Sequence, residues 1–152
     1  MDVELKGLTK SFGKVLAVNN MDLEIEQGEF LVLLGPSGCG KTTALRMIAG
    51  LETIEDGELY IDGKLMNEVL PKYRDVAMVF QSYALYPHMI VEDNIGYPLK
   101  MKGIKGQEKT NAILKAAKQV QLEEFLNRYP KQLSGGQRQR VALARALVRR
   151  PK

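Results

Sequence analysis

The first residues of this chain that could carry chemistry form a glycine-rich loop, Gly35-Pro36-Ser37-Gly38-Cys39-Gly40-Lys41-Thr42. They fit the pattern G-x-x-x-x-G-K-[ST] in full. Glycines let backbone N–H groups turn toward phosphate oxygens without a Cβ in the way, and a helix starting near Lys41 would aim its positive dipole end at the same anion. Lys41 would supply a charge for the β- and γ-phosphates, and the Thr42 hydroxyl would be a ligand for Mg²⁺. The loop therefore predicts a nucleoside triphosphate site.

A second segment with anion-binding character is Leu133-Ser134-Gly135-Gly136-Gln137. It precedes a helix that the apolar spacing predicts over Gln137–Arg150. A serine and two glycines at a helix start offer a hydroxyl, free N–H groups and the helix dipole. Alone, Ser-Gly-Gly is also an ordinary loop and helix cap. Its pairing with a complete phosphate loop earlier in the chain makes the signal strong.

The elements that must position these motifs change in kind along the chain. Alternation of apolar and polar residues predicts strands at Asp2–Leu8 and Leu16–Ile25, and a further strand is expected at Glu58–Ile61. The continuous apolar runs Phe30–Leu34 and Val76–Phe80 predict strands buried on both faces.

Helical spacing dominates from Val91 onward. It predicts a helix over Lys109–Leu126, which Tyr129-Pro130 breaks, before the helix that follows the serine-glycine segment. Earlier in the chain, a short helix is expected at Lys41–Ala49, directly after the phosphate loop.

With both motifs in place, the chain resembles the ABC-type ATPases over essentially all of its length. LSGGQ is the signature motif of that family, and here it runs on as LSGGQRQRVALARAL. Gln81, directly after VAMVF, matches the glutamine of the family's Q-loop. Phe12 lies where the family keeps an aromatic residue that stacks on adenine.

Within the family, the chain looks like the importer ATPases, especially those that serve carbohydrate uptake. The stretch Tyr86-Pro87-His88-Met89, followed by Asp93-Asn94-Ile95 and Pro98-Leu99-Lys100, carries this likeness. His88 is the only histidine and is not the family's later switch histidine.

The resemblance implies an α/β fold: a P-loop NTPase with a RecA-like core, an N-terminal antiparallel β region, a helical insertion and a truncated sheet. It divides one nucleotide-binding domain into three parts. Residues 1–81 hold the β region and the P-loop core, residues 82–134 form a helical subdomain that ends at the signature motif, and residues 135–152 form a helix that returns to the core.

The resemblance also implies the roles of single residues and the partners. Lys41 and Gln81 would be catalytic, and Thr42 and Gln81 would hold Mg²⁺. The residues implied to bind ATP are Phe12, Gly35, Pro36, Ser37, Gly38, Cys39, Gly40, Lys41, Thr42, Thr43 and Gln81. The signature residues implied to act on the partner subunit's ATP are Leu133, Ser134, Gly135, Gly136 and Gln137.

The implied assembly is a head-to-tail pair of ATPase subunits, identical or different, that drives transmembrane permease subunits through residues 82–100. No nucleic acid is expected as a partner. The implied location is cytoplasmic, peripheral on the inner face of the cell membrane. The imported solute would be a sugar.

Two parts of the family's catalytic site have no match in these 152 residues. They are the Walker B strand, which ends in Asp-Glu, and the switch histidine. The nearest imitation of Walker B, Leu59–Asp62, reads as a strand-to-turn corner. The 152 residues alone are therefore expected to be inactive in hydrolysis, and several strands of the central sheet are expected to be absent.

Composition excludes several classes of protein. The 45% apolar and 26% charged residues fit an ordinary globular domain, and one cysteine excludes an intramolecular disulfide. The N-terminus has no signal-peptide pattern, and no apolar run approaches the roughly 20 residues of a membrane helix.

The charge is unevenly distributed: residues 1–102 carry 10 Lys/Arg and 15 Asp/Glu, and residues 103–152 carry 12 and 3. A basic half favours a solvated helical face or an acidic partner, and it leaves nucleic acid or anionic lipid open. Two alternatives to the importer thus remain. One is a soluble ABC-type ATPase acting on nucleic acid or the ribosome, and the other is a non-catalytic nucleotide-binding fragment.

Overall fold

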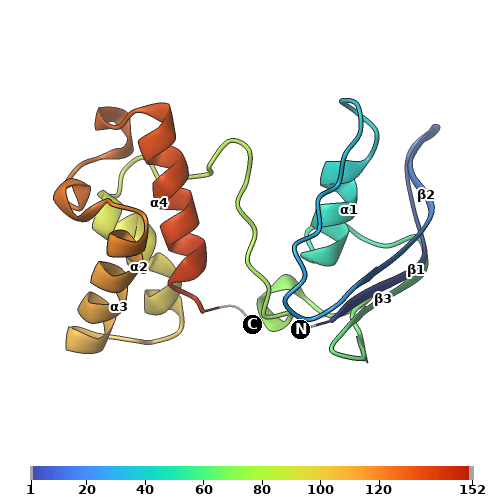
Figure 1. Ribbon diagram of the computed structural model, residues 1–152, viewed down its shortest axis with the longest axis horizontal. Coiled ribbons are helices and arrows are strands. Elements are labelled where there is room, and N and C mark those ends of the chain that lie inside the picture. The colour runs from blue at the N-terminus through green and yellow to red at the C-terminus, as the bar shows by residue number, and fades with distance from the viewer. Residues whose placement is uncertain (1, 151–152) are drawn as a thin grey trace. The chain divides into compact units, whose positions relative to one another are not determined.

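The alternating residues of the N-terminal region fold into an antiparallel sheet with the strand order β2-β1-β3-β4 (Figure 1). The computed structural model describes residues 2–150. Its strands are β1 (Val3–Phe12), β2 (Val15–Ile25), β3 (Asp56–Ile61) and β4 (Lys64–Leu65). Leu5 of β1 lies opposite Leu23 of β2 on one side and Leu59 of β3 on the other. This register places alternate apolar side chains on one face of the sheet.

That apolar face packs against α1 (Lys41–Ile48), the helix that follows the phosphate loop. The buried members of this core are Leu5, Leu8, Val18, Ala44, Met47, Leu59, Ile61 and Met66. A 3-10 helix, Pro71–Tyr73, follows β4. The sheet therefore supports α1 from one side and fixes the loop that precedes it.

Two strands that were predicted from continuous apolar runs do not form in the described chain. Phe30–Leu34 and Val76–Phe80 are extended segments without strand pairing among residues 2–150. Phe30 is 91% exposed and Leu34 is 87% exposed, although both were expected to be buried. An extended segment becomes a strand only when a neighbouring strand supplies hydrogen-bond partners, and no described strand lies against these two.

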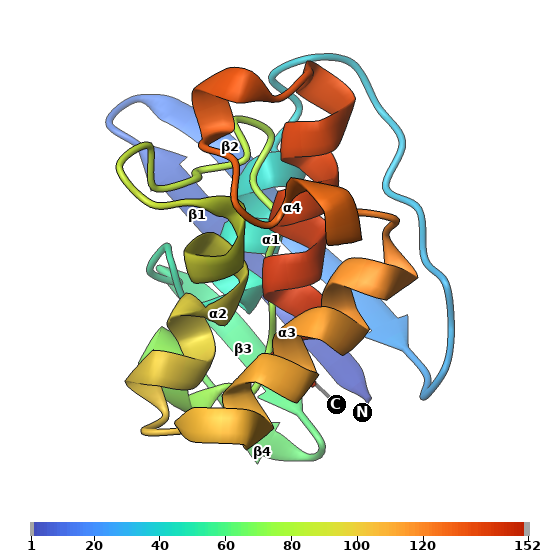
Figure 2. The same cartoon turned by 90° about the vertical axis from the view of Figure 1, so that its left-hand side faces the viewer.

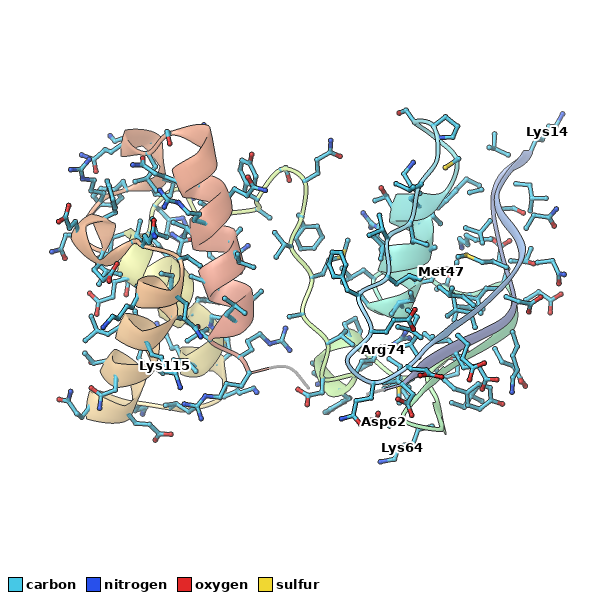
Figure 3. The ribbon with its side chains drawn as sticks, viewed as in Figure 1. Lys14, Met47, Asp62, Lys64, Arg74 and Lys115 are labelled. Atoms are coloured by element: carbon cyan, nitrogen blue, oxygen red, sulfur yellow. The ribbon has the colours of Figure 1, made fainter. Side chains whose placement is uncertain are left out.

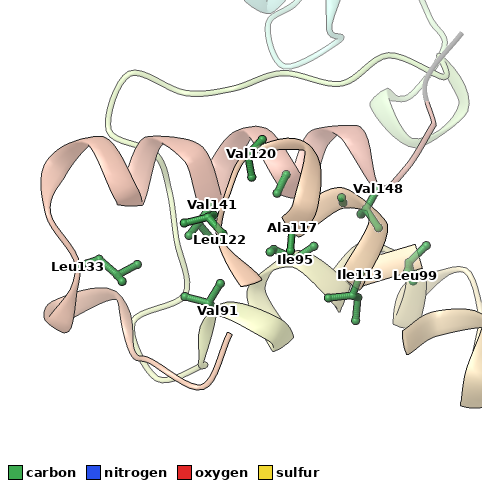
Figure 4. Close-up of a cluster of buried hydrophobic side chains, with 12 residues drawn as sticks. Val91, Ile95, Leu99, Ile113, Ala117, Val120, Leu122, Leu133, Val141 and Val148 are labelled. Carbon is green, nitrogen blue, oxygen red and sulfur yellow. The ribbon is translucent and has the colours of Figure 1, made fainter. Parts of the chain in front are cut away.

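The second half of the described chain is helical. It contains α2 (Val91–Met101), α3 (Gly106–Gln119) and α4 (Gly135–Leu147), with short 3-10 helices at Glu123–Phe125 and Pro130–Gln132. Figure 2 shows α2, α3 and α4 lying against one another. Their shared core, drawn in Figure 4, consists of Val91, Ile95, Leu99, Ile113, Ala116, Ala117, Val120, Leu122, Leu133, Val141, Ala144 and Val148.

A glycine in α2 sets how closely α2 and α3 pack. A Cβ added at Gly96 would lie 2.6 Å from the Cδ1 atom of Ile113 and 2.8 Å from the Cε atom of Lys109. Both distances are shorter than a Cβ tolerates, so a larger residue at position 96 would require the ends of the Ile113 and Lys109 side chains to shift.

The described chain separates into two compact units between Val76 and Ala77. The sequence places this boundary after residue 81. It also treats residues 135–152 as a segment that returns to the core, whereas α4 packs on α2 and α3 in the second unit. Residues 151 and 152 of that segment lie outside the described residues. The predicted helix over Lys109–Leu126 ends at Gln119, because Gln121 takes a left-handed backbone with φ of 55°.

Candidate nucleotide-binding site

The phosphate loop connects the extended segment Phe30–Leu34 to α1. Gly40 caps the N-terminus of the helix with φ of 88°, and a Cβ there would lie 2.1 Å from the carbonyl oxygen of Ala17. Only glycine fits this position, because it accepts the left-handed backbone and leaves room for β2. The loop is thus held against the sheet, and the first-turn N–H groups of α1 have no acceptor within their own helix.

Lys41 lies inside the loop that it is expected to serve. Its Nζ atom donates to the carbonyl oxygens of Gly35 and Pro36, both at 2.7 Å, and lies 3.3 Å from the Cys39 Sγ atom. Within residues 2–150 Lys41 has no carboxylate partner. In the described chain its positive charge thus meets backbone carbonyls and a thiol but no carboxylate, and it is available to an anion.

The other predicted residues of the loop line up with this arrangement. Ser37 and Gly38 are exposed at its tip, and Thr42 and Thr43 occupy the first turn of α1, where Thr42 is exposed. An exposed hydroxyl beside free N–H groups and an ammonium suits the phosphate chain of a nucleotide.

A buried arginine caps the opposite end of α1. Arg74 donates to the carbonyl oxygens of Met47 at 2.8 Å, Ile48 at 3.1 Å and Val69 at 2.7 Å. Figure 3 shows Arg74 near Met47 beside this end of the helix. Burial lowers the pKa of the Arg74 guanidinium, which has no carboxylate partner in the described chain. Arg74 satisfies terminal carbonyls and opposes the negative end of the helix dipole.

Phe12 ends β1 and is 49% exposed, which leaves ring surface for stacking. The Nζ atom of Lys10 lies 5.4 Å from its ring centroid. Lys10 is itself buried and pairs with Glu52 at 3.4 Å and Glu55 at 3.2 Å. The Ser11 N–H donates to Glu55 at 2.8 Å, so the end of β1 that carries Phe12 is held in place.

This ionic cluster shifts the pKa values of its members. Burial acts to lower the pKa of Lys10, but its hydrogen bonds to Glu55 and Glu52 outweigh burial and raise it. The pKa of Glu55 is lowered first by the hydrogen bond from the Ser11 backbone and then by the one from Lys10. Both groups are therefore held in their charged forms.

Gln81 is exposed in a turn closed by a hydrogen bond of 2.9 Å from the Tyr83 N–H to the Phe80 carbonyl. It belongs to the second unit, whereas Lys41, Thr42 and Phe12 belong to the first. Thr42 and Gln81 both offer oxygen donors of the kind that Mg²⁺ accepts. Among residues 2–150 no group of three His, Cys, Asp or Glu side chains could hold a metal ion.

The signature segment forms an open helix N-terminus. Ser134 is the N-cap of α4: its Oγ atom accepts from the Gln137 N–H at 3.2 Å, and its own N–H donates to the Gln137 side chain at 2.7 Å. Leu133 is buried and anchors the segment. A Cβ added at Gly135 or Gly136 would meet no atom within 4 Å. The serine thus has a capping role, and the space over the two glycines is open to a ligand.

Sequence reasoning missed two polar residues that shape the second unit. Asn94 is fully buried, accepts from the Tyr86 N–H at 2.8 Å, and donates to the carbonyls of Tyr86, Met89 and Ile90. Arg145 of α4 donates to the carbonyls of residues 83 and 84. An asparagine on the apolar face of a predicted helix is a usable signal, but an arginine in a basic helix is not.

Comparison with known proteins gives consistent matches. A family model described as "ABC transporter" matches residues 18–152. The sn-glycerol-3-phosphate import ATP-binding protein UgpC 1 of Rhizobium johnstonii is 55% identical over 99% of this chain and 41% of its own length. The trehalose/maltose import ATP-binding protein MalK of Thermococcus litoralis is 57% identical over 98% of this chain and 42% of its own length. The chain therefore spans about two-fifths of the length of these curated relatives.

Two solved structures share the fold. The dimeric structure of MJ0796, a bacterial ABC transporter cassette, superposes with a TM-score of 0.90 at 39% identity over 98% of this chain and 70% of that one. A post-hydrolysis dimeric state of MJ0796 bound to ADP and Pi gives a TM-score of 0.89 at 40% identity, with the same coverage. The α/β P-loop NTPase fold of an ABC cassette is thereby confirmed.

Proposed function

This chain belongs to the ABC transporter family, and we propose that it is the ATP-binding part of a solute importer. The observation that carries the proposal is the phosphate loop. Its lysine donates to two backbone carbonyls and to the Cys39 Sγ atom, and the loop precedes a helix whose first turn is free to bind an anion. No described carboxylate competes for that lysine.

In this proposal the loop from Gly35 to Thr43 holds the triphosphate of ATP. Lys41 exchanges its two carbonyl acceptors for phosphate oxygens, which are stronger partners because they are charged. Phe12 offers its exposed ring to adenine, on a strand end that the Lys10–Glu55 pair holds in place.

Mg²⁺, when bound, would neutralise charge that develops on the phosphates. The Thr42 hydroxyl and the Gln81 amide oxygen are the residues we propose to hold it. Gln81 would also orient the attacking water, because its side chain is exposed on a turn with a fixed backbone.

We place the signature segment on the ATP of a second subunit. Its helix start is open over Gly135 and Gly136, so the subunit's own structure does not fill the space. A second anion-binding helix end would complete the enclosure of phosphates held by a partner's loop. The dimeric state of MJ0796 supports this arrangement.

The coupling of this site to transport rests on the relatives. Importer ATP-binding proteins for glycerol 3-phosphate and for trehalose and maltose support a phosphorylated or plain carbohydrate as the solute. Permease subunits would dock on residues 82–100, and the protein would work at the inner face of the cell membrane. Among the described residues, no helix combines the length and the hydropathy of a membrane span.

The test uses the complete protein, purified with and without its permease subunits. We expect Mg²⁺-dependent ATP hydrolysis and ATP-dependent uptake of a carbohydrate into vesicles that contain the assembled complex. Failure to bind ATP would refute the whole proposal. Hydrolysis that DNA, RNA or ribosomes stimulate, and permeases do not, would favour the soluble alternative.

A further inference from the structure

Arg145 connects the helix of the signature motif to the turn that carries Gln81. Its Nη1 atom donates to the Ala84 carbonyl at 2.7 Å, and its Nη2 atom donates to the Tyr83 carbonyl at 2.9 Å. Its guanidinium also lies 5.7 Å from the Tyr86 ring centroid. All of these residues belong to the same compact unit.

The two acceptors belong to a strained stretch of backbone. Tyr83 has φ of 63° and Ala84 has φ of 46°, so two successive residues with side chains take the left-handed conformation. A residue with a side chain takes this conformation at an energetic cost, and it persists there only where its surroundings hold it. The Arg145 guanidinium holds Tyr83 and Ala84 in this conformation, because its two Nη atoms bind both carbonyls at once.

The surroundings of Arg145 favour this use of its hydrogen bonds. Burial lowers the pKa of its guanidinium, while the neighbouring Tyr86 acts to raise it. In the described chain Arg145 has no ion pair with a carboxylate, and its guanidinium donates hydrogen bonds to these two carbonyls. A partly desolvated cation needs such acceptors. Breaking the contact would therefore leave both the Arg145 guanidinium and the two carbonyls without these hydrogen bonds, which is unfavourable.

The strained pair lies directly after the Gln81 turn. Tyr83 supplies both ends of the connection: its N–H closes the turn on Phe80, and its carbonyl accepts from Arg145. The position of Gln81 therefore depends on α4, whose N-cap is Ser134 and whose first turn contains Gly136. A shift of α4 along its axis would pull directly on the Gln81 turn.

We propose that Arg145 is a positioning residue that makes the placement of Gln81 depend on the placement of the signature helix. Arg145 would link Gln81, which acts on a subunit's own ATP, to the signature segment, which acts on the partner's ATP. The inference rests on the proposed roles of Gln81 and the signature segment. Arg145 touches neither nucleotide nor metal in this proposal, so its loss should affect turnover and leave ATP binding nearly unchanged.

The experiment is a double-mutant cycle in the complete protein, with kcat and KM for ATP hydrolysis measured for each variant. Arg145→Ala should lower kcat by about tenfold or more and change KM by less than about threefold. In a Gln81→Ala background, Arg145→Ala should lower kcat only slightly further, because Arg145 acts through that glutamine. Arg149→Ala removes the same charge one turn further along and serves as the matched control, with kcat near that of the parent.

A rescue variant separates positioning from general stability. Glycine takes a left-handed backbone without strain, so Ala84→Gly should restore part of the kcat lost in Arg145→Ala. Arg145→Lys keeps the charge and loses the two-pronged guanidinium, so its kcat should lie between those of the parent and Arg145→Ala. The inference would be overturned, and the proposed function left intact, by two results together. The loss of kcat in Arg145→Ala would add fully to that in Gln81→Ala, and Ala84→Gly would not restore kcat. Normal turnover in Gln81→Ala alone would overturn both the inference and the proposed catalytic role of Gln81.

Discussion

The Nζ atom of Lys41 lies 2.7 Å from the carbonyl oxygen of Gly35, the first residue of the loop that Lys41 closes. The lysine thus spans the loop and holds it in a folded shape. Binding of a triphosphate would replace this contact and would not have to create order from a mobile chain.

Lys41→Ala should weaken ATP binding by the complete protein by about tenfold or more, or about 1.4 kcal/mol, as expected for a lost charged hydrogen bond. Titration with labelled ATP measures this directly. Lys64→Ala removes an exposed lysine of β4 and should bind ATP normally. Equal affinity of Lys41→Ala and the parent would contradict the assignment of the loop.

Gly136→Asp should leave ATP affinity of the isolated subunit unchanged and block ATP-driven pairing of subunits. The side chain meets no atom of its own subunit within 4 Å, and an acidic residue in the first turn of a helix is favourable. The new negative charge would instead face the partner's phosphates. Sedimentation with and without ATP distinguishes the two effects, with Gln139→Asp as a control later on α4. Loss of ATP binding by the single subunit would show that the motif acts within one chain.

Glu55→Gln should destabilise the protein at neutral pH and make no difference at low pH. The folded-state pKa of Glu55 is lowered by Ser11 and Lys10, so its stabilisation is complete above the unfolded-state value of about 4.3 and is lost as the pH falls through the folded value. Urea unfolding at several pH values from about 3 to 7 checks this. The control Glu68→Gln removes an exposed carboxylate, and a difference between Glu55→Gln and the parent that does not shrink as the pH falls would contradict the account.

A protein that consists of residues 1–152 alone should hydrolyse ATP far more slowly than the complete protein. Phosphoryl transfer to water needs a group that orients the water, and the Asp-Glu pair of the family does not occur in these residues. The exposed side chains of Phe30 and Leu34 should also promote association of this fragment. Steady-state phosphate release measures turnover, and a Lys41→Ala fragment corrects for contaminating ATPases. Equal rates for the fragment and the complete protein would refute the need for further catalytic residues.

The local patterns of the sequence predicted the elements that are built from near neighbours. The alternation in Val3 and Leu5 and the helix after Lys41 both appear where the sequence places them. The strand expected at Phe30–Leu34 does not form, because pairing depends on a distant segment. Helical periodicity also predicted a C-terminal end for α3 that lies beyond the observed end. The spacing of apolar residues does not indicate the left-handed backbone at Gln121.

The same distinction applies to the candidate site. Motifs of adjacent residues located Lys41 and Ser134, because phosphate binding by a loop or a helix end requires a short, fixed spacing. Arg145 was missed because its partners at residues 83 and 84 lie far away in the sequence. An arginine within LARAL looks like part of a solvated basic face until the fold brings the Gln81 turn beside it.

The close approach of α2 and α3 at Gly96 has an evolutionary consequence. Because a side chain at position 96 would collide with Ile113, the two positions share one small volume. Across related sequences, a residue larger than glycine at the first position should be accompanied by a smaller residue at the second. A larger residue at position 96 should therefore occur more often with a smaller residue at position 113 than with isoleucine.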